Sequence, residues 1–98
     1  MRPEVEHDMG KAADWYNERQ PGLGLRFCEE VFQVWDRLAE NPHVSARRHP
    51  LRNIRWLFPT HFPFRVAYEI DERRMEVVIL AVMHAARADS PWTKRISD

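Results

Sequence analysis

The chain of 98 residues has room for one domain, and its 44% hydrophobic and 31% charged residues are typical of a folded, soluble protein and exclude intrinsic disorder. The formal net charge is zero, but residues 1–45 carry five basic and nine acidic side chains, whereas residues 46–98 carry ten basic and six acidic ones. We therefore expect a single domain over residues 1–98, without strong nonspecific binding to nucleic acid, whose basic half is the C-terminal one.

Two amphipathic helices are predicted in the first half of the chain. Apolar residues recur at helical spacing from Pro3 to about Arg19, with Pro3 suited to the first turn and acidic residues near the N-terminal end. Residues 20–24, Gln-Pro-Gly-Leu-Gly, break the pattern, and a second helical pattern runs from about Leu25 to Glu40. So short a break predicts an antiparallel hairpin whose two apolar stripes need a common surface to cover.

The second half of the chain predicts a β-sheet. Residues 53–58 and 64–70 alternate between two faces, and residues 71–74 form a turn. Residues 75–83 are apolar on both faces, which suits a central strand covered on both sides or a strand whose second face is a binding surface. Together with the helices, this pattern predicts an α+β fold in which a two-helix antiparallel hairpin packs on an antiparallel β-sheet.

Cysteine and histidine content argues against a disulfide or metal site. The single cysteine, Cys28, cannot form an intramolecular disulfide, and its place in a helical pattern favours a core residue over a nucleophile. The five histidines lack the i, i+4 pair or the Cys/His spacing of a zinc site. No apolar run approaches the ~18 to 20 residues of a membrane span, and the first residues are not those of a signal peptide. We expect a cytoplasmic protein with no metal and no cofactor.

Four basic side chains on or just after the predicted strands are the candidates for a site: Arg55, Arg65, His84 and Arg87. Arg65 lies opposite the apolar face of its strand, so its guanidinium can point away from the helices and be free to bind phosphate or carboxylate. His84 can act as a general acid or base, and arginines can stabilise a phosphorane-like charge, as in a metal-free ribonuclease. The competing interpretation is that Arg65 and Arg87 pair with acids such as Glu69 or Asp89, and that His84 only caps a strand.

Short motifs in a fixed order resemble the RelE/ParE toxins of bacterial type II toxin–antitoxin (plasmid stabilisation) modules. They are Trp15-Tyr16, Pro21-Gly22-Leu23-Gly24, Phe62-Pro63-Phe64-Arg65 and Ala81-Val82-Met83-His84-Ala85-Ala86-Arg87, followed by Trp92 and Arg95. The resemblance covers nearly the whole chain and implies the same hairpin on an antiparallel sheet. It also implies that target or antitoxin is bound through Arg65, His84, Arg87, Trp92 and Arg95.

The resemblance implies one of two activities. RelE-like members cut messenger RNA on the ribosome with a basic set, for which this chain offers the four candidates above. That set is incomplete, because the strand before Arg65 has one basic residue, Arg55, and the tail has Trp92 where a tyrosine is common. ParE-like members, which poison DNA gyrase by binding and not by chemistry, are more similar. A ParE-like toxin with a cognate antitoxin is therefore the hypothesis; a ribosome-dependent mRNA endonuclease and a non-toxic antitoxin-binding remnant are the alternatives.

The start of the chain departs from the family. Family members begin with a strand before the first helix, whereas this chain begins Met1-Arg2-Pro3, where that strand should already have ended. The resemblance then implies that the edge of strand 75–83 is unpaired, and an open edge is a template for another chain. We expect this edge to pair with a symmetry mate, an antitoxin strand or a terminal segment of the chain, a two-fold homodimer being the simplest case.

Overall fold

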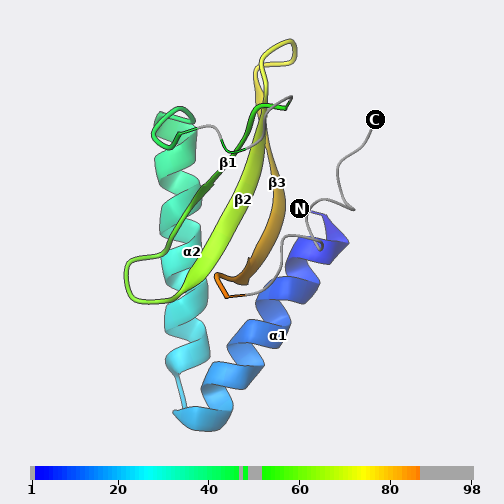
Figure 1. The fold of residues 1–98 in the computed structure, drawn as a ribbon. Helices are drawn as coiled ribbons and strands as arrows, with labels where there is room; N and C mark the ends of the chain where they lie inside the picture. The colour runs from blue at the N-terminus through cyan, green and yellow to red at the C-terminus, as the bar shows by residue number, and fades with distance from the viewer. Residues whose placement is uncertain (1, 47, 49–51, 87–98) are drawn as a thin grey trace.

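The computed structural model describes residues 2–46, 48 and 52–86 of the chain, and this part holds two helices and three strands (Figure 1). The elements are α1 (Pro3–Arg19), α2 (Leu23–Glu40), β1 (Ile54–Leu57), β2 (Phe64–Asp71) and β3 (Glu76–His84). The strands form an antiparallel sheet in the order β1-β2-β3, and both helices lie on one side of it. The predicted α+β fold is confirmed.

The turn between the helices explains the Pro-Gly-Leu-Gly motif. Gly22 has a φ of 88°, a left-handed backbone that favours glycine. Gly24 is buried where the two helices touch, and a Cβ at this position would overlap the carbonyl oxygen of Ala13 and lie 2.7 Å from Nδ2 of Asn17. The amide of Gly24 donates to Oδ1 of Asn17 at 2.9 Å, which satisfies one of the free N–H groups of the first turn of α2. The motif therefore allows α1 and α2 to pack at a short distance from each other next to the turn.

Gly24→Ala is expected to lower the free energy of unfolding by about 1–3 kcal/mol, because the added methyl group must push one helix backbone from the other. Gly10→Ala is the matched control, since Gly10 also lies in a helix but a Cβ there meets no atom within 4 Å. It should stabilise the protein by up to about 1 kcal/mol through helix propensity alone. Urea denaturation of both variants measures the difference. A loss of stability as large for Gly10→Ala as for Gly24→Ala would contradict this account of the turn.

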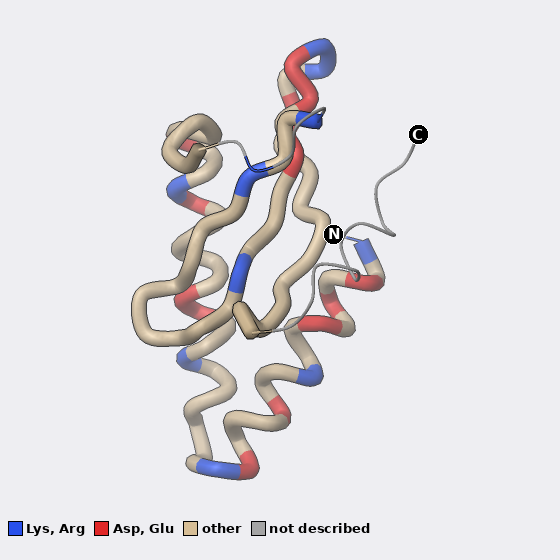
Figure 2. The backbone as a smooth tube through the Cα atoms, in the orientation of Figure 1, with Lys and Arg blue, Asp and Glu red and all other residues tan. Residues whose placement is uncertain are grey.

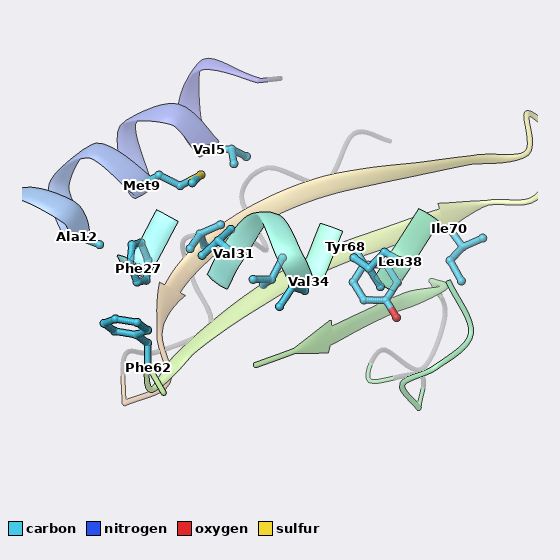
Figure 3. Packing of buried hydrophobic residues seen from close by; sticks show 12 residues of the cluster. Val5, Met9, Ala12, Phe27, Val31, Val34, Leu38, Phe62, Tyr68 and Ile70 are labelled. Carbon is cyan, nitrogen blue, oxygen red and sulfur yellow. The ribbon is translucent and has the colours of Figure 1, made fainter. Parts of the chain in front are cut away.

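The main core lies between the helices and the sheet (Figure 3). Helix α2 contributes Phe27, and this ring meets Phe62 at 5.2 Å and Phe64 at 4.9 Å between ring centroids. Tyr16 of α1 completes the aromatic group, 4.9 Å from Phe62. Cys28 is half-buried and packs against this core, as expected from its place in the helical pattern. The aromatic group joins both helices to the start of β2.

A second buried cluster covers the opposite face of the sheet. It consists of Ile54, Ala67, Leu80, Ala81 and Met83. The register of β2 against β3 shifts between Ala67 and Tyr68, so Leu80 is an extra residue in β3 and shares this face with its neighbour Ala81. The two apolar faces predicted for residues 75–83 therefore serve two cores. Within the described sheet, however, β3 is an edge strand and not a central one.

Helix α1 lies along the outer edge of β3 (Figure 1). The backbone N–H of Val82 points away from β2 and donates to Oδ2 of Asp8 at 3.0 Å. A side chain of α1 thus satisfies one of the edge groups that were expected to be open. Pairing of this edge with another chain remains a prediction.

A buried carboxylate fixes the loop between β1 and β2 to α2. Glu30 is 7% exposed; its Oε1 accepts the backbone N–H of His61 at 2.9 Å, and its Oε2 lies 2.9 Å from the His61 ring and 3.4 Å from Nε of Arg26. Burial by itself raises the pKa of Glu30. The hydrogen bonds from His61, the electrostatic attraction of the His61 ring and the hydrogen bond from Arg26 together outweigh burial, so the pKa of Glu30 is lowered from its usual value of 4.5. The folded protein therefore favours the ionised form of Glu30.

Glu30→Gln is expected to lower the free energy of unfolding by about 1–3 kcal/mol at pH 7, because the hydrogen bonds to a charged acceptor are lost. The pKa of Glu30 is lower in the folded than in the unfolded state, so its contribution is fully present above about pH 4.5 and is lost as pH falls through the folded value. The variant should lose less stability on acidification than the parent. Urea denaturation at pH 7 and pH 3, with exposed Glu29→Gln as control, tests this. Parallel acid losses in parent and Glu30→Gln would contradict it.

Candidate functional site

The two candidate arginines on the strands lie on opposite faces of the sheet. Arg55 is paired across the strands with Tyr68, whose ring belongs to the main core, and directly paired residues share a face. The guanidinium of Arg65 lies over the ring of Trp56, 4.9 Å from its centroid, and this tryptophan packs against the second cluster. The structure therefore does not bring Arg55 and Arg65 together.

Both arginines make hydrogen bonds that hold nearby backbone. Arg55 donates from Nη1 to the carbonyl of Ser45 at 2.6 Å and from Nε to Oδ1 of Asn53 at 3.0 Å. Arg65 donates from Nη2 to the carbonyl of Ala85 at 2.7 Å. The expectation that the guanidinium of Arg65 is free was wrong, because the chain just after β3 passes within its reach. Both arginines therefore stabilise the fold through hydrogen bonds to other segments of the chain.

The competing interpretation paired Arg65 and Arg87 with acids such as Glu69 or Asp89. Asp89 lies outside the described residues, and the pairing of Arg65 with Glu69 was wrong. Glu69 instead accepts two hydrogen bonds from Arg52, at 2.6 Å from Nε and 2.8 Å from Nη2. Arg65 and Glu69 lie four residues apart on β2, and side chains at that spacing in a strand are separated by about 13 Å. Arg52, just before β1, is close because the register places Ile54 opposite Glu69.

His84 ends β3 and lies on the helix side of the sheet. Its ring packs edge-on against Phe64, its partner in the register, at 5.3 Å between centroids, and its Nδ1 accepts the backbone N–H of Ala86 at 3.1 Å. The hydrogen bond agrees with His84 capping the strand, and in the neutral ring it leaves the proton on Nε2. His84 and Arg65 thus lie on opposite faces. Three other candidates fall outside the described residues: Arg87, Trp92 and Arg95.

His84 also lines a groove between α1 and the adjoining ends of β2 and β3. The groove has a volume of about 440 Å³. Its polar side chains are His7, Asp8, Lys11 and His84, and its largest apolar ones are Trp15, Tyr16, Phe64 and Met83. The α1 residues of the groove were not among the predicted site residues. Their spacing of four residues, from position 7 to 11 to 15, is the signal that could have found them, because it places all three on one side of a helix.

Trp15 forms a fixed aromatic rim of the groove. Its side chain is 49% exposed, and it meets Tyr16 edge-on at 5.0 Å between centroids. The guanidinium of Arg19 lies over the Trp15 ring at 3.2 Å from the centroid and donates to the Trp15 carbonyl. An exposed aromatic ring held in this way is typical of an anchor in protein–protein interfaces.

The polar side chains that line the groove offer several hydrogen-bond donors. Among the described residues that line it, Asp8 is the one acid and accepts the Val82 amide, while Lys11 and the two histidines supply hydrogen-bond donors. Acidic residues are frequent along both helices, including α1, which lines the groove (Figure 2). The groove is thus suited to an apolar segment that carries carboxylates.

Comparison with known proteins identifies a family. A family model described as ParE toxin of type II toxin-antitoxin system, parDE, matches residues 1–89. No curated protein matches the chain. In the described part of the chain, neither helix is long and apolar enough to cross a membrane, and no three His, Cys, Asp or Glu side chains gather where a metal ion could bind.

Proposed function

Because the chain belongs to the ParE toxin family of type II toxin–antitoxin systems, we propose that it acts on DNA gyrase by binding and without cutting RNA. Family membership makes it a toxin component and implies an antitoxin as partner. The proposed place of action is the cytoplasm, where the target works on DNA.

The separation of the candidate catalytic groups carries this proposal. Acid–base cleavage of RNA needs a proton-transfer group and cationic groups within about 3 Å of the same reacting atoms. Arg55 and Arg65 instead point to opposite faces of the sheet, and each holds a backbone carbonyl. His84 lies across the sheet from Arg65. This arrangement supports a binding mechanism over an RNA-cleaving one.

We place the antitoxin in the groove lined by His7, Lys11, Trp15 and His84. Antitoxin tails typically order on binding as an amphipathic helix or an added strand. The aromatic rim suits their apolar residues, and the donors of Lys11 and the histidines suit their carboxylates. Failure of toxin and cognate antitoxin to associate at micromolar concentration would contradict this part of the proposal.

Controlled expression of the toxin, with mapping of mRNA ends, tests the mechanism. Growth should stop while ribosome-bound mRNA stays intact, and His84→Ala should inhibit growth as strongly as the parent. A nuclease that uses His84 for proton transfer would instead lose typically 10²- to 10⁴-fold in rate. Cleavage at fixed codon positions that disappears in His84→Ala would overturn the proposal in favour of an mRNA endonuclease.

A further inference from the structure

A second apolar surface lies on α2, beside the buried stripe that faces the main core, and its members Cys28 and Trp35 also pack against that core. It consists of Leu25, Cys28, Phe32, Trp35 and Ala39, and is called here the outer stripe. Leu25 is 65% and Phe32 45% exposed, and Ala39 is exposed as well. Positions 25, 32 and 39 repeat every seven residues, as do positions 28 and 35. That spacing is typical of a helix that packs along another helix.

The outer stripe continues onto the sheet through Trp35. The Trp35 ring meets Phe32 edge-on at 5.1 Å. It also lines a hollow of about 510 Å³, together with Arg2 and with Val77, Val78 and Ile79 of β3. The indole Nε1 of Trp35 is buried and has no hydrogen-bond partner among the described residues. A buried donor without a partner costs free energy, and a small shift on binding would let it reach an acceptor. The hollow and the donor without a partner both lie where the outer stripe meets β3.

One border of the outer stripe is acidic. Glu29 and Asp36 follow Leu25 and Phe32 by four residues, and Glu40 lies on the same side of the helix. All three acids are exposed, and none forms an ion pair within the part of the chain that the structure describes. Three carboxylates in a row raise the local concentration of cations and attract a basic partner.

This border disfavours a second copy of the chain as the occupant. An antiparallel two-fold pairing of α2 centred on Phe32 would set Glu29 of one copy beside Asp36 of the other, and like charges so placed repel. The whole hairpin half, residues 1–45, holds nine acidic and five basic side chains. A partner with basic residues next to its apolar stripe avoids this repulsion.

We propose that the outer stripe of α2 docks an amphipathic helix of another protein, with Lys or Arg beside the apolar residues of that helix. Apolar side chains of the partner pack on Phe32 and Leu25 and fill the hollow at Trp35. Its basic side chains face Glu29 and Asp36. This surface lies outside the groove around His84, so the proposal stands whether or not gyrase is the target.

Two synthetic 21-residue helices with the same leucine repeat test the proposal, one with Lys and one with Glu at the positions beside the repeat. Fluorescence anisotropy with the full chain should show at least tenfold tighter binding of the Lys helix. Phe32→Ser should weaken that binding tenfold or more, as for an interface anchor. Phe58→Ser is the matched control, because Phe58 is 46% exposed and lies outside the outer stripe. It should leave binding unchanged.

A charge-reversed variant, Glu29→Lys with Asp36→Lys, keeps the apolar residues and should prefer the Glu helix. Circular dichroism checks that each variant is folded. Equal binding of the two helices, an equal loss in Phe58→Ser, or an unchanged preference after charge reversal would overturn the proposal. Sedimentation of the chain alone adds one more decisive outcome. If the parent sediments as a dimer and Phe32→Ser as a monomer, a second copy of the chain occupies the outer stripe and the proposal is wrong.

Discussion

Phe27→Ala should lower the free energy of unfolding by about 3–5 kcal/mol, the usual loss for a buried phenylalanine. Phe27 is 0% exposed and contacts the rings of Tyr16, Phe62 and Phe64, so its removal leaves a cavity that joins both helices and the start of β2. Domains of this size are typically stable by about 5–15 kcal/mol, so a large share of the total is at stake. Urea denaturation followed by circular dichroism measures the change.

Phe58→Ala is the control for this loss, because Phe58 is 46% exposed and should change the stability by less than about 1 kcal/mol. The difference between the two variants isolates burial from residue type. Similar losses for Phe27→Ala and Phe58→Ala would contradict the placement of the main core.

Trp15→Ala should weaken binding of the cognate antitoxin about thirtyfold or more, because loss of an aromatic anchor typically costs 2 kcal/mol or more. Trp15 is 49% exposed at the rim of the groove, so the fold should persist. Calorimetric titration of the purified antitoxin into each variant gives the affinity. Phe58→Ala is again the matched control. An unchanged affinity in Trp15→Ala, with a loss in Phe32→Ser, would place the antitoxin on the outer stripe and not in the groove.

Helices and strands were predictable to within two residues, because each helix has one side against a core and β2 and β3 pack against a core on each face. The period of 3.6 residues in α2 and the alternation in β2 follow directly from that burial. The breaks also had chemical causes in the sequence: Pro21 and Gly22 end the first helix, and Asn41 with Pro42 follows the second. Local sequence patterns are therefore enough to predict where the helices and strands begin and end.

The surroundings of the candidate site were less predictable, because they depend on register and on where distant segments meet. The extra residue at Leu80 changes which side chains of β3 share a face. The local sequence pattern does not predict this extra residue. The acceptor for Arg65 is the carbonyl of Ala85, twenty residues away. The groove lies between α1 and the strand ends because α1 lies along the edge of β3, which periodicity alone does not specify.

Purified gyrase gives the most direct test of the central claim that this chain is an antitoxin-controlled toxin that acts by binding. Supercoiling of relaxed plasmid by gyrase is measured with increasing amounts of the chain, alone and as a preformed complex with its antitoxin. Loss of supercoiling with accumulation of cleaved DNA, both reversed in the antitoxin complex, is the predicted result. Unchanged supercoiling at excess toxin, together with cleavage of mRNA on translating ribosomes by the same preparation, would contradict it.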